Sequence, residues 1–297
     1  MIVLPGQDEV SRSFASSLAS SLGARTCEPA FKTFPDGESY VRIPCEVKGE
    51  SVVVVKTMYP DQDRSFVTSI LLADAAREAG AERVTLVAPY MAYARQDRAF
   101  LAGEAVSIRA LMKALWSAGY SSLVTVEIHK DESLKFFPGQ AVSVRPFGYM
   151  AKAIGISGDY VVLSPDLGAL PRAKELAAQL RTEYDYIEKQ RDRYTGEVTM
   201  KPKEINVAGR RVIIVDDIIS TGTTVAKAAQ MLRSLGALSV DVIVAHALLA
   251  PGAEERLREA GIQRVYAANT APVSSPLVVQ VDVAPLVAAR LKEIVNP

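Results

Sequence analysis

The chain has 297 residues, 49% of them hydrophobic, and its 34 basic and 34 acidic side chains give a formal net charge of zero. A chain of this length usually forms two domains of roughly 100–200 residues, and it has enough apolar side chains for a large core. A balanced charge argues against nucleic acid as the main partner, because a phosphate backbone requires a strongly basic face. A small phosphorylated ligand needs only a few local cations and is not excluded.

The N-terminus and the cysteines indicate a cytoplasmic protein. Met1–Pro5 has the apolar character of a short strand and lacks the basic region and the cleavage site of a signal peptide. No apolar run reaches the roughly 18 residues of a membrane span, so we expect no membrane association. The two cysteines, Cys27 and Cys45, are too few for a disulfide framework or a structural zinc site, and they do not form a Cys-x-x-Cys pair. We therefore expect a reducing compartment.

Short β-branched runs alternate along the chain with segments of helical periodicity. The apolar runs suit strands that are covered on both faces. The strand candidates are Ser51–Lys56, Arg83–Ala88, Leu123–Ile128, Tyr160–Ser164, Arg211–Val215, Val240–Ala245 and Arg264–Ala267. Two helices are marked by apolar side chains at helical spacing before a glycine stop, namely Ile108–Trp116 before Gly119 and Val225–Leu235 before Gly236. This alternation predicts an α/β fold built on mainly parallel sheets flanked by helices.

A faint internal repeat indicates two related halves. The order strand, helix, glycine, strand occurs twice, as Val52–Val55, Ser65–Ala79, Gly80 and Arg83–Ala88, and again as Val212–Val215, Gly222–Leu235, Gly236 and Ser239–Val244. Any two βαβ units resemble each other, so duplication stays open. We place the division near Pro146–Gly148, which gives domains of residues 1–146 and 147–285 and a C-terminal helical segment, Leu286–Val295.

The most informative segment is Val212–Thr224, in which an apolar strand is followed by two acids, four hydroxyl side chains around one glycine, and a helix. A helix N-terminus binds phosphate through unpaired N–H groups and a partial positive charge. The candidate phosphate ligands are Ser220, Thr221, Gly222, Thr223 and Thr224, of which the glycine permits close approach of the backbone. Asp216 and Asp217 have the wrong sign for phosphate and suit the cis hydroxyls of a ribose or a bound magnesium. A plain helix cap is the alternative, and the acid pair argues against it.

This segment resembles the signature of the type I phosphoribosyltransferase fold, in which the two acids hold ribose hydroxyls and the loop holds the 5-phosphate. The resemblance implies two phosphoribosyltransferase-like domains. The family usually has Gly-Gly where this chain has Gly222-Thr223. The chain has neither a Gly-x-x-x-x-Gly-Lys-Ser/Thr loop nor a Gly-x-Gly-x-x-Gly fingerprint, so an ordinary P-loop kinase and a Rossmann dehydrogenase are not indicated.

Further segments resemble those of the ribose-phosphate diphosphokinases, also called phosphoribosyl pyrophosphate synthetases, in their shorter archaeal form. The first is Phe34-Pro35-Asp36-Gly37-Glu38, which alone would be read as a turn. In that family the turn reaches across a subunit interface, where Phe34, Asp36 and Glu38 would contact the adenine of ATP. The resemblance therefore implies a homo-oligomer of at least a dimer, with the site shared between subunits.

The next segments follow predicted strands. Tyr93–Arg98 would by itself be a charged loop, but the carboxyl end of a strand is where open α/β sheets bind ligands. By resemblance Arg95, Gln96 and Asp97 bind ATP. A histidine at a strand end is more often structural, yet His129 stands where the family has a ligand of the magnesium on ATP. His246 lacks such a motif, and we interpret it as structural.

The last segments would act on the transferred diphosphate. In Leu163–Arg172 the resemblance assigns Asp166, Gly168 and Arg172 to a diphosphate loop, with Asp166 joining His129 around Mg²⁺. Ile187–Arg193 is by composition an exposed charged loop. Its position matches the mobile catalytic loop of the family, which makes Lys189 and Arg191 the candidate catalytic residues.

The resemblance thus implies transfer of the diphosphoryl group of ATP to the C1 hydroxyl of ribose 5-phosphate, which gives phosphoribosyl pyrophosphate and AMP. It also implies that the C-terminal helix returns to the first domain. Two other functions stay open. A nucleobase phosphoribosyltransferase explains the Asp216–Thr224 segment equally well but not the 93–98 and 189–191 segments. A non-catalytic regulatory relative would have lost charged site residues that this chain keeps.

Overall fold

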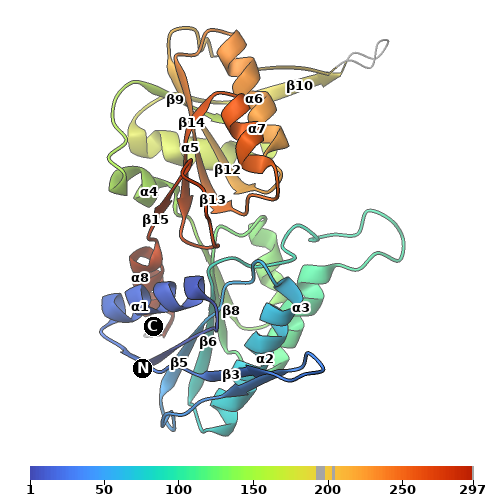
Figure 1. The fold of residues 1–297 in the computed structure, drawn as a ribbon, viewed down its shortest axis with the longest axis vertical. Coiled ribbons are helices and arrows are strands. Elements are labelled where there is room, and N and C mark those ends of the chain that lie inside the picture. The colour runs from blue at the N-terminus through green and yellow to red at the C-terminus, as the bar shows by residue number, and fades with distance from the viewer. Residues whose placement is uncertain (192–197, 203–204, 296–297) are drawn as a thin grey trace. The chain divides into compact units, whose positions relative to one another are not determined.

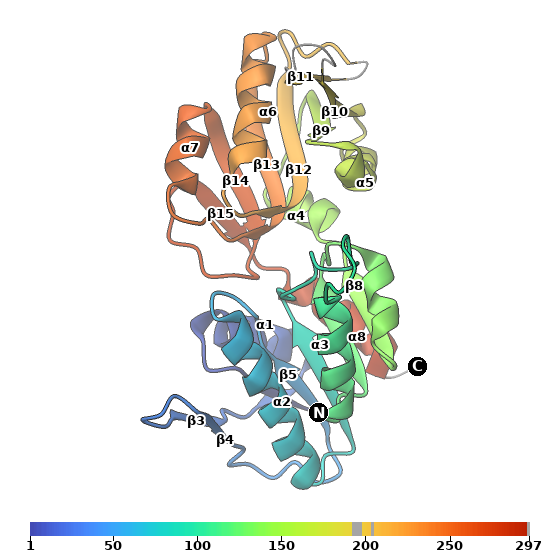
Figure 2. The ribbon, with the colours of Figure 1, turned by 90° about the vertical axis from the view of Figure 1, so that its right-hand side faces the viewer.

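The computed structural model describes residues 1–191, 198–202 and 205–295. The chain forms two compact units (Figures 1 and 2), and each contains a sheet flanked by helices. The first unit holds Met1–Arg145, Asn269–Pro272 and the segment from Asp282, and the second holds Pro146–Ala268 and Val273–Val281. The boundary thus follows Arg145, and segments 269–272 and 282–285, which the sequence had placed in the second domain, lie in the first.

The first unit is built on a six-stranded sheet with the order β2-β1-β5-β6-β7-β8, in which every pairing is parallel. Its strands are β1 (Ile2–Pro5), β2 (Arg25–Thr26), β5 (Ser51–Val55), β6 (Arg83–Ala88), β7 (Ser122–Val126) and β8 (Gln140–Val144). Its helices are α1 (Glu9–Leu22), α2 (Gln62–Glu78), α3 (Ser107–Ser117), the short 3₁₀ helix η1 (Asp131–Phe136) and α8 (Ala284–Val295). The strand residues are buried nearly throughout β1 and β5, because helices cover both faces of the sheet.

A two-stranded hairpin stands apart from this sheet. It consists of β3 (Ala30–Thr33) and β4 (Ser39–Arg42), which pair antiparallel from Ala30 opposite Arg42 to Thr33 opposite Ser39. Figure 2 shows the hairpin projecting from the body of the first unit. The hairpin carries the Phe34–Glu38 turn at its tip.

The second unit has seven strands in the order β11-β10-β9-β12-β13-β14-β15. They are β9 (Tyr160–Ser164), β10 (Tyr184–Arg191), β11 (Val198–Pro202), β12 (Arg211–Ile219), β13 (Ser239–Ala247), β14 (Ile262–Ala268) and β15 (Val278–Val281). The helices are α4 (Phe147–Ala153), the 3₁₀ turn η2 (Leu167–Ala169), α5 (Leu170–Leu180), α6 (Thr223–Ser234) and α7 (Ala253–Glu259). Only the β10–β11 pairing is antiparallel among the described strands of this sheet.

The two sheets follow the same path. The order β2-β1-β5-β6-β7-β8 matches β10-β9-β12-β13-β14-β15 strand for strand, and β11 is an addition at one edge. The sequence repeat aligns Val52–Val55 with Val212–Val215, so Lys56 stands where Asp216 stands and Thr57 where Asp217 stands. The predicted α/β class with two mainly parallel, helix-flanked sheets is confirmed.

Two local predictions are wrong. The segment Ile187–Arg193 was predicted to be a loop, but Ile187–Arg191 belongs to strand β10. Its backbone pairs with β11, from Ile187 opposite Pro202 to Arg191 opposite Val198. Cys27 and Cys45, which gave no indication of a disulfide, are joined by one, with their Cα atoms 6.5 Å apart. The count of cysteines says nothing about which of them the fold brings together.

No helix in the described part of the chain is long and apolar enough to cross a membrane. The cytoplasmic location stays a prediction.

Candidate active site

The acid pair Asp216 and Asp217 lies inside β12 rather than after it, contrary to the predicted strand end at Val215. The strand continues because β13 pairs with it as far as Ile219 opposite Ala247. On its other side, β9 pairs with β12 only as far as Ile214 opposite Leu163. The chain runs from β9 to β10 on one side and returns to β12 on the other, so the order of strands reverses here. In open α/β sheets this reversal, at the carboxyl ends of the strands, is where ligands bind.

The two acids of the pair differ in their surroundings. Asp217 is only 5% exposed and forms an ion pair with Arg172, whose Nη2 lies 3.6 Å from Oδ2. The Asp217 N–H donates to Asp216 Oδ1 at 2.9 Å. Burial raises the pKa of Asp216 well above its usual range, the negative charge of Asp217 raises it further, and Arg172 opposes both effects. The pair therefore tends to hold a proton and is suited to exchange hydrogen bonds with neutral hydroxyl groups.

The loop after β12 leads directly into α6, and Gly222 is the residue before the helix. Its φ of +73° is left-handed, and an added Cβ would lie 3.3 Å from both Cγ and Cδ2 of Leu257 in α7. Glycine is therefore required both by the backbone conformation and by the neighbouring helix. Because glycine has no side chain to cap α6, the N–H groups of the first turn are left for another acceptor.

The carbonyl groups of this loop are fixed from the following strand and helix. The N–H of Leu248 donates to Ile219 O at 2.9 Å and the N–H of Ala250 donates to Ser220 O at 3.0 Å. The Arg256 guanidinium donates to the Thr221 carbonyl, and the hydroxyl oxygens of Thr221 and Thr223 lie 3.3 Å apart. Three carbonyl groups of the loop are therefore already hydrogen-bonded. Phosphate binding by Ser220–Thr224 stays a prediction.

The predicted diphosphate loop lies between β9 and α5 in the same unit. Asp166 Oδ1 accepts from the N–H groups of Gly168 at 2.9 Å and Ala169 at 3.2 Å, so this carboxylate caps η2. A Cβ on Gly168 would lie 3.2 Å from that oxygen, which explains the glycine. Arg172 follows in the first turn of α5, and its ion pair with Asp217 joins this loop to the acid pair. The role of Asp166 and Arg172 towards a diphosphate stays a prediction.

The predicted adenine turn is ordered by its own backbone. The Phe34 N–H donates to Glu38 O and the Gly37 N–H donates to Phe34 O, both at 2.8 Å, and Asp36 Oδ1 accepts from the Glu38 N–H at 3.2 Å. The Phe34 ring packs edge-on against Tyr40 and beneath the Lys32 ammonium. The side chain is 36% exposed, and its stacking on adenine stays a prediction.

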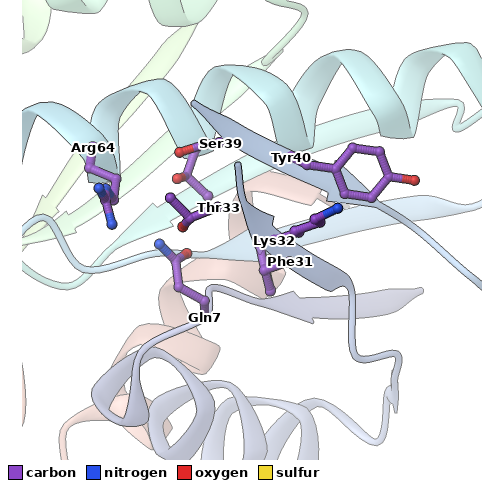
Figure 3. A pocket seen from close by; sticks show the side chains of 8 residues that line it. Gln7, Phe31, Lys32, Thr33, Ser39, Tyr40 and Arg64 are labelled. Carbon is purple, nitrogen blue, oxygen red and sulfur yellow. The ribbon is translucent and has the colours of Figure 1, made fainter. Parts of the chain in front are cut away.

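A pocket of about 140 Å³ lies between this hairpin, the β1–α1 loop and α2 (Figure 3). Hairpin side chains line one side, and the β1–α1 loop and the first turns of α2 line the other. The lining residues are Gln7, Phe31, Lys32, Thr33, Ser39, Tyr40, Arg64 and Thr68.

The structure brings two of the predicted ATP segments together within the first unit. Lys130, next to His129, lies 3.8 Å from Asp97 Oδ2 through its ammonium group. In the same loop as Asp97, the side-chain amide oxygen Oε1 of Gln96 accepts from the Ser107 hydroxyl at the start of α3, and the Arg95 side chain is exposed. The loops after β6 and β7 therefore present Arg95, Asp97 and His129 at one end of the sheet.

The backbone just before His129 adopts a positive φ angle. Glu127, directly after β7, has a φ of +38°, and the next N–H, of Ile128, donates to Ser143 Oγ at 2.9 Å. His246 is the penultimate residue of β13, opposite Ile218, and it is buried. Its structural role stays a prediction.

The remaining predicted residues are divided between the two units or have side chains outside the described residues. His129 belongs to the first unit, and Asp166 and the acid pair belong to the second. Lys189 and Arg191 lie in β10, and their side chains are outside the described residues. Within the described ranges, no group of three or more His, Cys, Asp or Glu side chains is placed to hold a metal ion.

Two family models match most of the chain. One, described as the N-terminal domain of ribose phosphate pyrophosphokinase, matches residues 2–119, and the other, described as a phosphoribosyl transferase domain, matches residues 149–277. A ribose-phosphate pyrophosphokinase of Aeropyrum pernix is 44% identical over 99% of this chain and 97% of its own length. The chain belongs to the ribose-phosphate pyrophosphokinase family.

Other members of the ribose-phosphate pyrophosphokinase family agree with this assignment. The enzyme of Saccharolobus solfataricus is 41% identical over 98% of this chain and 100% of its own length. The crystal structure of phosphoribosylpyrophosphate synthetase from Mycobacterium smegmatis matches with a TM-score of 0.89 at 28% identity, covering 100% of this chain and 98% of that one. The family resemblance and the two phosphoribosyltransferase-like domains expected from the motifs are confirmed.

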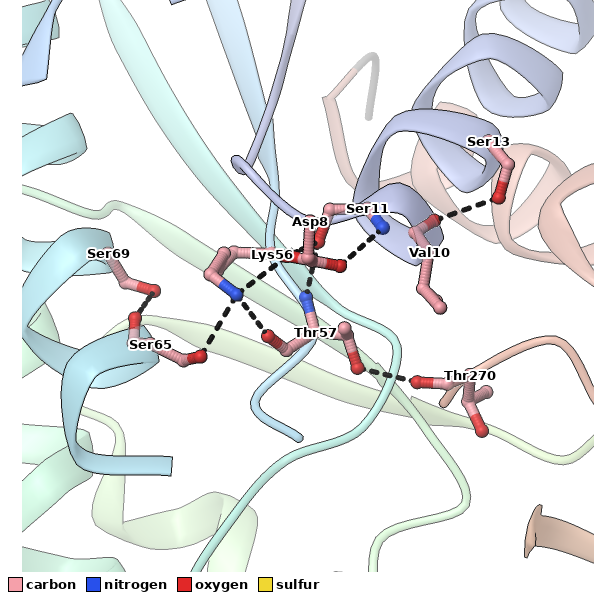
Figure 4. Close-up of polar contacts among 9 residues, drawn as sticks. All are labelled: Asp8, Val10, Ser11, Ser13, Lys56, Thr57, Ser65, Ser69 and Thr270. Atoms are coloured by element: carbon pink, nitrogen blue, oxygen red, sulfur yellow. Dashed lines mark hydrogen bonds and ion pairs between the residues drawn. The ribbon is translucent and has the colours of Figure 1, made fainter. Parts of the chain in front are cut away.

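Sequence reasoning missed one charged centre in this member of the ribose-phosphate pyrophosphokinase family. Lys56, at the end of β5, is 2% exposed, and its ammonium group donates to Asp8 Oδ2, Thr57 O and Ser65 Oγ at 2.7–3.0 Å (Figure 4). Asp8 also caps α1 by accepting from the Ser11 N–H at 2.8 Å. The internal repeat could have revealed this centre, because it aligns Lys56 with Asp216.

Proposed function

We propose that this chain transfers the diphosphoryl group of ATP to the C1 hydroxyl of ribose 5-phosphate, producing phosphoribosyl pyrophosphate and AMP, and that it requires Mg²⁺. The observation that carries the proposal is the sequence of groups at the carboxyl end of β12. The acid pair, of which Asp217 is buried, is followed there by a hydroxyl-rich loop and by the uncapped start of α6. The named relatives, matched over nearly their whole length, support the same reaction.

Ribose 5-phosphate would bind to these groups by charge and hydrogen bonding. The 5-phosphate would lie at the N-terminus of α6, where N–H groups and the hydroxyls of Thr221, Thr223 and Thr224 donate to it. The acid pair would hold the ribose hydroxyls. Its raised pKa supports this role, since a protonated carboxyl donates and an ionised one accepts.

The proposed magnesium ion would bind together with ATP and be held by only a few protein side chains. Mg²⁺ is usually held by one or two protein groups together with substrate phosphates rather than by a full protein cage. Asp166, which uses Oδ1 to cap its own turn, and His129 are the proposed protein ligands. The ion would neutralise charge on the triphosphate and polarise the β-phosphoryl group.

ATP would be held by side chains of two subunits. Arg95, Gln96 and Asp97 are the proposed ligands from one subunit, and the exposed ring of Phe34 with Asp36 and Glu38 would meet the adenine from the partner's hairpin. Transfer of this kind needs mainly in-line positioning and neutralisation of charge. Lys189 and Arg191 are proposed to meet the charge that develops at the β-phosphoryl group and on AMP.

Incubation of the protein with ATP, Mg²⁺ and ribose 5-phosphate, followed by nucleotide chromatography, tests the proposal. AMP should form in step with phosphoribosyl pyrophosphate and only when the sugar phosphate is present. ADP as the product, or AMP formed equally without the sugar, would contradict it. Consumption of phosphoribosyl pyrophosphate with a nucleobase would favour a phosphoribosyltransferase, and nucleotide binding without any product would favour a regulatory relative.

A further inference from the structure

The Cys27–Cys45 disulfide connects the two arms through which the chain enters and leaves the β3–β4 hairpin. Cys27 directly follows β2, and its N–H donates to Val3 O at 3.0 Å, so it is fixed to the central sheet. Cys45 follows β4 and precedes Val47, which is fully buried. The bond spans 18 positions of the sequence and encloses both strands and the Phe34–Glu38 turn.

Within one subunit, this bond and the packing against α2 and the core are the contacts that hold the hairpin. It is a separate two-stranded sheet and shares no ladder with the six-stranded sheet of its unit. An isolated two-stranded ribbon is marginally stable at best in water. Phe31, Val41 and Ile43 pack partly against the core, but most of the residues of β3, β4 and their turn are exposed.

The contact between the hairpin and α2 is also incompletely packed. The pocket of Figure 3 lies in this contact, and Gln7 and Thr68 line it from the side of the body. Both Gln7 Oε1 and Thr68 Oγ1 are buried without a hydrogen-bond partner among the described residues, and Thr68 is only 1% exposed. The pocket therefore leaves part of the contact between the hairpin and α2 unpacked.

We propose that Cys27 and Cys45 are positioning residues for the reaction. Their disulfide limits the movement of the hairpin and so presents Phe34, Asp36 and Glu38 to the nucleotide in one arrangement. This proposal rests on the proposed function, in which that turn binds adenine. Closing a loop of this length disfavours its open states by a factor on the order of 100, which is an upper limit for the effect on the hairpin.

The expected signature is a loss of ATP binding with little loss of chemistry. If the tip is correctly placed for only a fraction of the time, the apparent affinity for ATP falls by that fraction. We expect the KM for ATP to rise about three- to tenfold, whereas kcat and the KM for ribose 5-phosphate stay within about twofold. A cysteine pair that only stabilised the fold would not separate the two substrates in this way.

The experiment compares the oxidised chain, the chain reduced with a dithiol, and the double variant Cys27→Ser/Cys45→Ser. Reduction adds two electrons and two protons to the disulfide, which gives two thiols, while the dithiol becomes a cyclic disulfide. Because the chain has only two cysteines, thiol titration in denaturant should give none before reduction and two after it. The matched control is the double variant treated with the same dithiol, which should not change.

Two independent measurements decide the outcome. Hydrogen exchange followed by mass spectrometry should show faster exchange in residues 28–44 after reduction, and steady-state kinetics should show the rise in the KM for ATP. Two thiols in the untreated chain, or an unchanged KM for ATP despite faster exchange, would overturn the proposal. If the chain makes no phosphoribosyl pyrophosphate in any form, the proposed function fails, while slow exchange of the oxidised hairpin would still show that the disulfide restrains it.

Discussion

Replacing Gly222 by alanine should damage the sugar-phosphate site more than the backbone alone requires. The residue has a φ of +73°, and Gly209, in a turn before β12, has a φ of +72° with nothing within 4 Å of an added Cβ. Gly209→Ala is therefore a matched control, since both variants place a methyl group at the same unfavourable φ. That conformational cost is about 1–2 kcal/mol at either position.

At Gly222 a second cost is added. The new Cβ would lie 3.3 Å from Cγ and Cδ2 of Leu257 and 3.5 Å from the carbonyl oxygen of Ala253, both in α7. Leu257 is fully buried and cannot turn away into solvent, so the loop or α7 must shift. Crowding of this kind costs about 1–3 kcal/mol more, and displacement of the loop should raise the KM for ribose 5-phosphate about tenfold or more.

Urea unfolding gives the free energy of unfolding of both variants, and steady-state formation of AMP gives the KM for each substrate. We expect Gly222→Ala to lose about twice as much stability as Gly209→Ala, and only Gly222→Ala to weaken binding of the sugar phosphate. Equal losses of stability together with an unchanged KM would refute the reasoning, because they would show that the contact with α7 does not shape the loop.

Three further predictions concern charged side chains and their neighbours. Lys189→Ala should lower turnover by roughly a hundredfold or more with a much smaller change in ATP binding, and near-normal turnover would remove it from catalysis. Asp216→Asn should flatten the pH dependence of stability. The raised pKa of Asp216 means that the folded chain binds a proton that the unfolded chain releases. The free energy of unfolding of the wild-type chain should therefore fall as the pH rises from about 4 towards the raised pKa. An identical fall in the variant would be contrary evidence. Gly6→Ala should lower the free energy of unfolding by about 2 kcal/mol, because the added Cβ would lie 2.3 Å from Lys56 Cδ. The loss should be smaller when Lys56 is also replaced by alanine. If urea unfolding shows that the losses of the two single variants simply add, the two side chains do not collide.

The elements predicted most accurately from the sequence are strands in which nearly every residue is buried. Arg83–Ala88 and Tyr160–Ser164 have the bounds expected from their apolar runs, because strands covered on both faces leave a continuous apolar signal. The extent of β12 could not be predicted in this way. Its acidic residues read as a strand end, and only the pairing of Ile218 with His246 in β13 reveals that the strand continues.

Pairing between distant segments explains the other differences. The charged composition of 187–191 indicated a loop, yet the backbone pairs with Val198–Pro202, which composition does not show. The disulfide depends on how β2 and β4 bring Cys27 and Cys45 together. In the candidate site, motifs identified the acid pair and Gly222, whereas the Arg172–Asp217 ion pair required the structure. The roles of the individual residues towards ATP, Mg²⁺ and the sugar phosphate stay predictions.

The two sheets have the same strand order, which raises the question of how many sugar phosphates one chain binds. In the second unit β12 carries the acid pair near its carboxyl end, and in the first the corresponding position, directly after β5, is Lys56, whose ammonium group donates to acceptors supplied by its own neighbours. A sugar ring placed there would have to displace a side chain already satisfied by a carboxylate, a carbonyl and a hydroxyl. Although the architecture is repeated, the described residues thus carry the predicted pentose site in the second unit alone, and under the proposed function we expect one ribose 5-phosphate to bind per chain.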